Sequence, residues 1–299
     1  MQIRVRDDRN RVLHLARAPK RVVSLVPSDT YNVCALGVGE TLVGRTDYCE
    51  LPEPFAGLAK KVPSVGGTKN PRVKDILALE PDLVLANQEE NTRGDLEELA
   101  QAGVRVFVAF PKRVVEGLAH LARLARIFGV ERESGSRELV KRGYDALRRA
   151  ESEAPGKRVR VFCPIWMDPL MTINGSTFIS DMLVTCGAEN VFADRERRYP
   201  LAADLANAKP LPKEKTEERD TRYPRITLDE LVQRAPDLVL LPDEPHPFTE
   251  EDATVFRALP PFAKSPDRVR FVSGKDLCWY GAVSVEGIDR VRKTLGAPD

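Results

Sequence analysis

Aromatic rings, a histidine and carboxylates occur together in three short segments of the sequence. The segments carry Trp166 with Asp168, Glu244 with His246, and Trp279 with Tyr280. A tryptophan or tyrosine ring can stack on the face of a planar macrocycle, and a neutral imidazole can bind cobalt or iron as an axial ligand. If the fold brings these segments to one edge, the sequence predicts a site for a flat metal chelate.

Only one of the three histidines, His246, lies in a segment that suits ligand binding. His14 falls in a predicted hairpin and His120 in a predicted helix, which favours structural roles for both. His246 lies in a proline-bounded loop and is the candidate metal ligand. A packed or hydrogen-bonding ring remains the alternative interpretation of this residue.

The motifs of the common enzyme classes are absent from the sequence. It contains no GxxxxGKS/T, GxSxG or HExxH motif and no paired CxxC, whereas phosphoryl, acyl and zinc chemistry commonly use them. Gly37-Val38-Gly39 does not complete GxGxxG and follows a predicted helix, so no dinucleotide-binding turn is indicated. Asp168 has no identifiable partner for general-base catalysis. We therefore predict no catalytic residues and no enzyme activity.

A near-duplication within the chain indicates how the candidate residues are positioned. The stretch VKDILALEPDLVLA, residues 73–86, recurs as ITLDELVQRAPDLVLL, residues 226–241. Each copy has the pattern of a short amphipathic helix, a Pro-Asp turn and a buried strand, as in parallel sheets. The copies lie much further apart than the ~20 to 50 residues that separate the units of solenoids. The repeat therefore predicts two lobes.

Further paired segments extend the two lobes. Residues 21–27 correspond to residues 158–164 as an opening strand, and residues 35–44 correspond to residues 185–193 as a helix end followed by a strand. The second lobe adds one segment without a counterpart, residues 194–223. Its charge and proline content predict a solvated excursion on the surface.

The first lobe is predicted to alternate strands and helices after an N-terminal β-hairpin. The expected strands are at 3–6, 12–15, 22–26, 41–46, 83–86 and 104–109, and the expected helices include 29–36 and 93–102. Such alternation gives a parallel sheet with helices on both faces. The predicted fold class is therefore α/β, with two Rossmann-like lobes.

A single long α-helix is expected to join the two lobes. Residues 112–153 form a proline-free helical tract, and its second part, residues 133–150, is too polar to be core. A helix of ~20 residues spans ~30 Å and can run along the outside of a protein. We therefore assign residues 1–130 to an N-terminal α/β lobe, 131–154 to a connecting backbone helix and 155–299 to a C-terminal α/β lobe.

The predicted sheets place the aromatic segments at one edge. Ligands of open parallel sheets bind beyond the carboxyl ends of the strands. Those ends carry Asp47–Tyr48 in the first lobe, and Ile165–Asp168, Pro242–Phe248 and Trp279–Tyr280 in the second. Both tryptophans of the chain therefore fall on loops at this edge, where Trp279 is expected to be exposed and the rings can stack on a ligand.

Composition and charge limit the possible partners. The 299 residues include 46 basic and 45 acidic side chains and have a net charge of +1, so no overall field favours nucleic acid or a membrane surface. No segment approaches the ~18 apolar residues of a membrane span, and no secretory signal is recognised. The five cysteines form no CxxC pair and are expected to be buried, reduced thiols. These features predict a cytoplasmic protein, with the periplasm or cell envelope as the alternative if a signal was removed.

Motifs along nearly the whole chain carry a family resemblance. They are RVVSLVPSDTYNVCALGVGETLVGRTDYC at residues 21–49, VPSVGGTKNP, ILALEPDLVLA, the long helix, WMDP, LPDEPHPF and CWYG. In this order and spacing the sequence resembles the helical-backbone metal-receptor family. These are the class III substrate-binding proteins of ABC importers for vitamin B12, haem and iron-siderophores. The sequence looks most like their cobalamin-binding branch.

The resemblance implies a non-catalytic binding protein that holds a metal chelate in the cleft between two lobes. Tyr48, Tyr223 and Trp279 match aromatic positions that line this cleft in the family, and Trp166 lies in the equivalent strand-end loop of the second lobe. The implied ligand is a cobalamin-like corrinoid, haem or a ferric siderophore, and no intrinsic cofactor is expected.

The resemblance also implies a protein partner. Family members dock onto an ABC importer permease through a carboxylate on each lobe, and the matching places here are Asp229 in the second lobe and Lys74, beside Asp75, in the first. We expect a monomer that binds no nucleic acid and does not insert into a membrane. A cytosolic corrinoid- or tetrapyrrole-handling protein, or an enzyme not coupled to an importer, remains the alternative.

Overall fold

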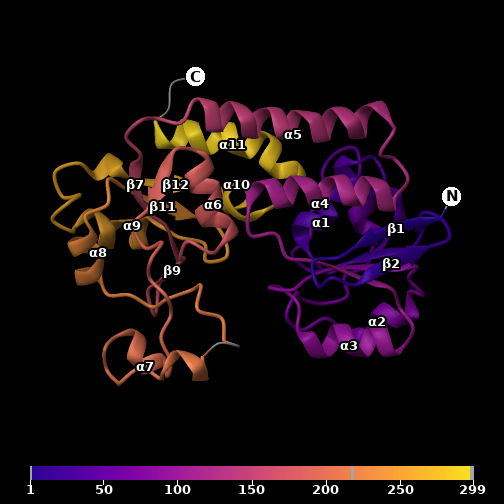
Figure 1. The fold of residues 1–299 in the computed structure, drawn as a ribbon, viewed down its shortest axis with the longest axis horizontal. Helices are drawn as coiled ribbons and strands as arrows, with labels where there is room; N and C mark the ends of the chain where they lie inside the picture. The colour runs from indigo at the N-terminus through magenta and orange to yellow at the C-terminus, as the bar shows by residue number, and fades with distance from the viewer. Residues whose placement is uncertain (1, 217–218, 297–299) are drawn as a thin grey trace. The chain divides into compact units, whose positions relative to one another are not determined.

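The structure divides into two compact units, which are described separately (Figure 1). This computed structural model describes residues 2–216 and 219–296. Unit 1 comprises Met1–Pro111, Val115–Asp145 and Trp279–Val285. Unit 2 comprises Lys112–Val114, Ala146–Cys278 and Glu286–Asp299. A short segment from the C-terminal part of the chain therefore completes unit 1.

The long helix predicted at 133–150 is present as α5, Ser134–Ser152. The division between the two units falls inside it, after Asp145. A division by contacts does not define where a lobe can fold by itself, so the domain limits 1–130, 131–154 and 155–299 stay a prediction.

Unit 1 contains a parallel sheet in the order β4-β3-β5-β6. The strands are β3 (Val22–Ser24), β4 (Leu42–Arg45), β5 (Leu83–Asn87) and β6 (Val106–Ala109). A separate antiparallel hairpin pairs β1 (Ile3–Arg6) with β2 (Val12–Leu15), which confirms the predicted hairpin. Every residue of β5 is buried, as its apolar run in the repeat indicates.

Helices cover both faces of this sheet because its strands bury side chains on both sides. The helical elements are α1 (Pro27–Ala35), α2 (Val73–Ala78), α3 (Arg93–Gln101) and α4 (Val114–Ile127), with short 3-10 turns at η1 (Gly39–Thr41) and η2 (Ala56–Lys60). Leu83 and Leu85 of β5 pack in one core cluster with Leu124 of α4. Val84, between them, packs in the other cluster with Ile76 of α2.

Unit 2 repeats the same sheet order, β10-β7-β11-β12, with all neighbours parallel. The strands are β7 (Val159–Phe162), β10 (Ala188–Asn190), β11 (Leu238–Pro242) and β12 (Val269–Val272), and a small antiparallel pair is formed by β8 (Pro164–Trp166) and β9 (Met171–Thr172). The helical elements are α6 (Phe178–Thr185), α7 (Leu201–Asp204), η3 (Lys213–Lys215), α8 (Leu228–Arg234), α9 (Glu250–Arg257), η4 (Pro266–Arg268), α10 (Gly274–Cys278) and α11 (Ala282–Leu295).

The sequence repeat is confirmed as a repeat of topology. Among the strands of each four-stranded sheet, the first along the chain lies inside the sheet, the second lies at one edge, and the third and fourth follow on the other side. The paired helix ends also match, since Gly37 after α1 and Gly187 after α6 both have positive φ, 78° and 92°. The predicted α/β fold with parallel sheets in two lobes is therefore confirmed.

The expectation of a merely solvated excursion at residues 194–223 is wrong for its first part. The side chains of Arg195 and Asp204 are buried and form an ion pair, with Arg195 Nη1 3.2 Å from Asp204 Oδ1. The carboxylate of Asp204 also accepts hydrogen bonds from the backbone N–H groups of Arg198 and Arg225. Arg195 in turn pairs with Glu230 of α8. The charged residues that predict a surface loop from the sequence therefore attach this part of the segment to the rest of unit 2.

Among the helices in the described parts of the chain, none has both the length and the apolar character that crossing a membrane requires.

Candidate functional site

The carboxyl ends of β7 and β11 bring two predicted segments together in unit 2. The buried strand β11 ends at Pro242, and its loop continues to Thr249, which begins α9 with a capping box involving Asp252. After β7, the chain turns at once into the β8-β9 hairpin, which presents Trp166 at its tip. Trp166 and His246 therefore come from different strand ends and meet at the same edge.

Three rings form a cluster at this edge, which we call the aromatic cluster: Trp166, His246 and Phe248. The ring centroids of Trp166 and His246 are 5.3 Å apart, and those of His246 and Phe248 are 4.6 Å apart in an edge-on arrangement. Phe248 is buried in the unit 2 core and holds the loop in place. Trp166 remains 45% exposed. Its indole N–H donates to the carbonyl of Asp168 at 2.9 Å, so the exposed surface that it offers is an aromatic face.

The imidazole of His246 also lies near one carboxylate. His246 Nε2 is 3.7 Å from Asp252 Oδ2, the same oxygen that accepts from the backbone N–H of Thr249 at 2.8 Å. Among the described residues, no group of three or more histidine, cysteine, aspartate or glutamate side chains is arranged to hold a metal ion. His246 can therefore supply one ligand to a metal that brings the rest of its coordination shell.

The other predicted residues of unit 2 differ in exposure and in their partners. Asp168 is exposed, and its carbonyl accepts from Trp166. Glu244 is half-buried and accepts from the thiol of Cys278 at 3.4 Å, so its carboxylate is directed to α10. Tyr223 is half-buried under the guanidinium of Arg222, in a segment that pairs with β9.

In unit 1, Tyr48 is the predicted ring that lies open to solvent. It follows β4 and is 66% exposed. Asp47 beside it accepts a hydrogen bond from Ser64, which fixes the start of the loop. An exposed ring on a loop at the carboxyl end of a strand suits ligand stacking.

The expectation that Trp279 is exposed is wrong. Trp279 is only 6% exposed and Tyr280 only 4%, and both belong to unit 1. Trp279 contacts Tyr31 edge-on, while the Tyr280 hydroxyl accepts from Asn87 Nδ2 at 3.3 Å. Burial and the nearby Asp29 charge raise the pKa of Tyr280 well above its usual range. The position of a ring after a strand does not determine whether the ring is exposed or buried.

Sequence reasoning did not find a buried polar network around Asp29. His120 Nε2 lies 2.7 Å from Asp29 Oδ1, and both side chains are buried. Arg123 donates to the other ring nitrogen at 3.4 Å, so Nε2 carries the hydrogen that is shared with Asp29. Asn32 accepts from the backbone N–H of Ala282 at 2.8 Å and donates to Asp29. The network fixes the C-terminal segment to α1, which confirms the structural role predicted for His120.

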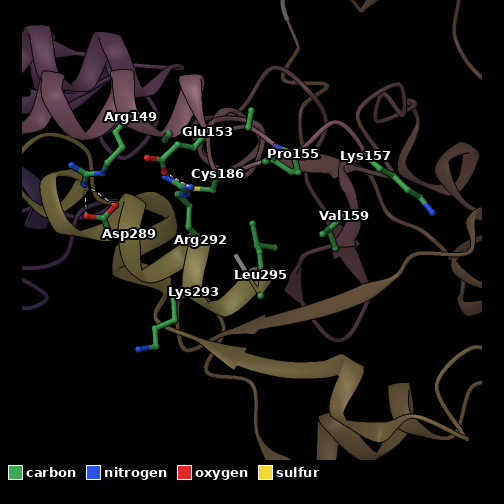
Figure 2. Close-up of a pocket in the computed structure, with 14 residues that line it drawn as sticks. Arg149, Glu153, Pro155, Lys157, Val159, Cys186, Asp289, Arg292, Lys293 and Leu295 are labelled. Atoms are coloured by element: carbon green, nitrogen blue, oxygen red, sulfur yellow. Dashed lines mark hydrogen bonds and ion pairs between the residues drawn. The ribbon is translucent and has the colours of Figure 1, made fainter. Parts of the chain in front are cut away.

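A cavity of about 700 Å³ lies elsewhere in unit 2, among the ends of α5 and α11 and the start of β7 (Figure 2). Two ion pairs line it: Arg149 with Asp289 at 2.6 Å, and Arg292 with Glu153 at 2.7 Å. Its lining includes Val159, the first residue of β7, and so it lies at the amino end of that strand. None of the predicted binding residues lines it.

The predicted docking acids are both on the surface. Asp75 is exposed in the first turn of α2 and forms an ion pair with Arg72. Asp229 is exposed in the first turn of α8. Each carboxylate lies at the amino end of a short helix of its own unit, which favours negative charge there.

Comparison with known proteins agrees with this architecture. The family model described as periplasmic binding protein matches residues 22–244. A vitamin B12-binding protein of Yersinia pestis (strain Pestoides F) is 33% identical over 186 residues, which are 62% of this chain and 64% of that protein. The match thus spans less than two thirds of the length of that relative. The same identity is found with the vitamin B12-binding protein of Yersinia pseudotuberculosis serotype O:3 (strain YPIII).

Solved structures of low sequence identity share the fold. The periplasmic vitamin B12 binding protein BtuF of Vibrio cholerae has a TM-score of 0.69 at 17% identity, covering 93% of this chain and 97% of that one. The periplasmic heme-binding protein RhuT from Roseiflexus sp. RS-1 has a TM-score of 0.71 at 17% identity, covering 92% and 97%. An ABC-type Fe3+-hydroxamate transport system structure from Saccharomonospora viridis DSM 43017 has a TM-score of 0.71 at 19% identity, covering 99% of both chains.

These findings contradict the cytoplasmic location predicted from the sequence. The matching family is one of periplasmic proteins, and so are the vitamin B12 and heme binders of the same fold. Net charge and cysteine spacing are weak guides to location, because buried thiols can persist without pairing in any compartment. The resemblance is confirmed by a family match over most of the chain, and the protein belongs to the periplasmic binding protein family.

Proposed function

We propose that this protein is a non-catalytic substrate-binding protein that holds a metal chelate and delivers it to an ABC importer. Membership of the periplasmic binding protein family supports a binding role. The names of its relatives and of similar structures specify vitamin B12 binding, heme binding and an ABC-type Fe3+-hydroxamate transport system. The observation that carries the proposal is the exposed Trp166 ring beside His246 at the carboxyl edge of unit 2.

The chemistry of this cluster suits a chelate better than a bare ion. A corrinoid, a haem or a ferric siderophore brings most of its own donor atoms, so one imidazole at most is needed from the protein. The apolar face of Trp166 can stack on a flat ring system, because its N–H is already bonded to Asp168. The chelate is cargo in this role, and no intrinsic cofactor is proposed.

We propose the same ligand-binding residues as the sequence predicts, and the geometry distinguishes exposed rings from buried rings among them. Tyr48 and Trp166 are exposed and are proposed to stack on the chelate directly. Trp279 and Tyr280 are buried and are proposed to support the loops of unit 1. Asp168, Tyr223, Glu244 and His246 complete the set.

The importer permease is the proposed protein partner. Asp229 on α8 and Asp75 on α2 are exposed carboxylates, and we propose that they dock onto basic residues of the permease. Asp75 would exchange its ion pair with Arg72 for one with the permease. We propose that the protein is a monomer before docking.

Replacement of Trp166 tests the stacking role. Trp166→Ala should weaken chelate binding by about 1 to 3 kcal/mol in calorimetry, because a stacked aromatic anchor contributes on that scale. Phe271→Ala is the matched control, since Phe271 is 42% exposed on β12 and is not part of the aromatic cluster. Equal affinities for wild type and Trp166→Ala would argue against the site.

Replacement of His246 separates metal coordination from packing. If the imidazole binds the metal, His246→Gln should shift the visible absorption band of bound hydroxocobalamin or haemin, because an axial nitrogen is lost. Trp166→Ala should weaken binding without that shift. Identical bands for wild type and His246→Gln would assign His246 to packing against Trp166 and Phe248.

A further inference from the structure

Unit 1 also contains a cavity, and none of the predicted binding residues lines it. Its volume is about 540 Å³, and it is lined by Arg4, Val5, Arg6, Asp7, Asp8, Asn10, Arg123 and Arg126. These residues come from β1, the hairpin turn and α4, which Figure 1 shows close together. We call it the arginine cavity.

Packing of the hairpin places two of these arginines. Val5 of β1 is buried in the core cluster that also contains Leu124 of α4. Arg4 and Arg6 alternate with Val5 along the strand, so their side chains lie on its exposed face. The apolar face of β1 therefore fixes the position of its basic face.

Helix α4 supplies the other two arginines. Arg123 and Arg126 are three residues apart, so they are neighbours on the surface of the helix. Arg123 Nη1 donates to the carbonyl of Arg6 at 3.1 Å, which joins the helix to β1. This contact holds both sides of the cavity at a fixed separation.

The two acidic residues of the cavity are already engaged. Asp7 is buried, and its carboxylate accepts from the backbone N–H of Arg11 at 2.8 Å and pairs with the Arg11 side chain at 3.1 Å. Asp8 accepts from Arg123 at 2.6 Å and from the backbone N–H of Phe110 at 2.7 Å. Burial raises the pKa of Asp8, but these hydrogen bonds outweigh it and bring the pKa below its usual value. Both carboxylates are therefore committed to fixed partners.

Positive charge is left over after this pairing. Arg4, Arg6 and Arg126 line the cavity, and their guanidinium groups form no ion pair with a residue that the structure describes. A concave site with three uncompensated guanidinium groups attracts an anion with several oxygens.

We propose that the arginine cavity binds a phosphoryl group. A phosphoryl group carries about two negative charges and three acceptor oxygens on one phosphorus atom, which matches guanidinium groups that approach from two elements. A single carboxylate has one charge and would leave part of the surplus uncompensated. The group belongs either to a soluble phosphate compound or to a phospholipid whose headgroup is a phosphate monoester. This site is independent of chelate binding.

Two probes distinguish these sources. Calorimetry at low salt measures binding of inorganic pyrophosphate, and co-sedimentation measures binding to phosphatidylcholine vesicles that contain phosphatidic acid. Arg6→Gln and Arg126→Gln should each weaken binding of the effective probe about tenfold, since each removes a charge-assisted hydrogen bond. High salt should weaken binding as well, because the contacts are partly exposed.

Arg105→Gln is the matched control. Arg105 is an exposed arginine of unit 1, outside the cavity, without an ion pair to any described residue. It should leave binding unchanged. Pyrophosphate binding identifies a soluble ligand, and vesicle binding alone, lost in the same variants, identifies a headgroup. The proposal is overturned if neither probe binds, if citrate binds more tightly than pyrophosphate, or if Arg105→Gln weakens binding as much as Arg6→Gln.

Discussion

At the residue scale, the candidate site depends on which aromatic rings the units bury. Trp166 satisfies its N–H within its own hairpin and leaves a ring face exposed. Trp279 is buried and contacts Tyr31 edge-on. The two tryptophans are thus not equivalent, although both lie on segments that follow strands. This difference in exposure is why we propose the stacking role for Trp166 and a packing role for Trp279.

Buried cysteines give a prediction at the same scale. Burial raises the pKa values of Cys163 and Cys186 to about 12, and burial with the nearby Cys49 does the same for Cys34. Because the thiolate is the reactive form, these thiols should resist alkylation in the folded protein. Iodoacetamide at neutral pH should label at most one thiol, the half-buried Cys278.

The control for this measurement is labelling in denaturant without a reductant. All five cysteines should then react, because none forms a disulfide in the structure. Two or more labelled thiols in the folded protein would contradict the burial, and fewer than five in denaturant would reveal a disulfide.

The sequence predicts residue types at the strand ends better than it predicts their exposure. Trp166 and His246 could be placed at one edge because parallel strands end on the same side. The burial of Tyr280 could not, because it depends on Asn87 and His120, which are distant in sequence. The buried Arg195–Asp204 ion pair could not be predicted for a related reason. Charged side chains predict a surface position unless a partner from another part of the chain is known.

At the element scale, most helices and strands follow directly from apolar periodicity. The predicted strand at 83–86 is β5, and the predicted helix at 93–102 is α3, which ends one residue earlier. Such agreement is expected where a strand is buried on both faces, as β5 is, because its sequence is then an unbroken apolar run. The contact between the 279–285 segment and α1 joins elements from opposite ends of the chain, and no local pattern encodes it.

Gly281 tests this contact between elements. It has a φ of 88°, and a side chain there would meet the carboxamide of Asn32, which holds the backbone N–H of Ala282. Gly281→Ala should lower the free energy of unfolding by about 2 to 4 kcal/mol, from backbone strain and the clash together. Urea denaturation measures this change.

Gly37→Ala is the matched variant. Gly37 has a similar φ of 78°, but no atom lies within 4 Å of the position that a side chain would take. Gly37→Ala should lower the free energy of unfolding by only about 1 kcal/mol, which is the cost of the backbone strain alone. If both variants lose the same stability, Asn32 does not restrict position 281, and the fastening role assigned to this segment is wrong.

At the scale of the whole molecule, the chain consists of two units whose four-stranded sheets share one topology. Each sheet presents its strand ends as one edge, and each edge carries an exposed ring, Tyr48 in unit 1 and Trp166 in unit 2. The repeat between residues 73–86 and 226–241 predicts this duplication, and the identical strand orders confirm it. The identity of the chelate depends on loop side chains, which the repeat does not constrain.

The most direct test of the central claim is a visible absorption titration of the protein with hydroxocobalamin, haemin and a ferric hydroxamate. The account predicts a saturable change of one-to-one stoichiometry for at least one of the three chelates, with the chelate recovered unaltered after the protein is denatured. Saturation that requires a higher chelate concentration in Trp166→Ala and is unchanged in Phe271→Ala would place the ligand at the aromatic cluster. The absence of a saturable change with all three chelates, or chemical conversion of the chelate by the protein, would contradict a non-catalytic chelate-binding role.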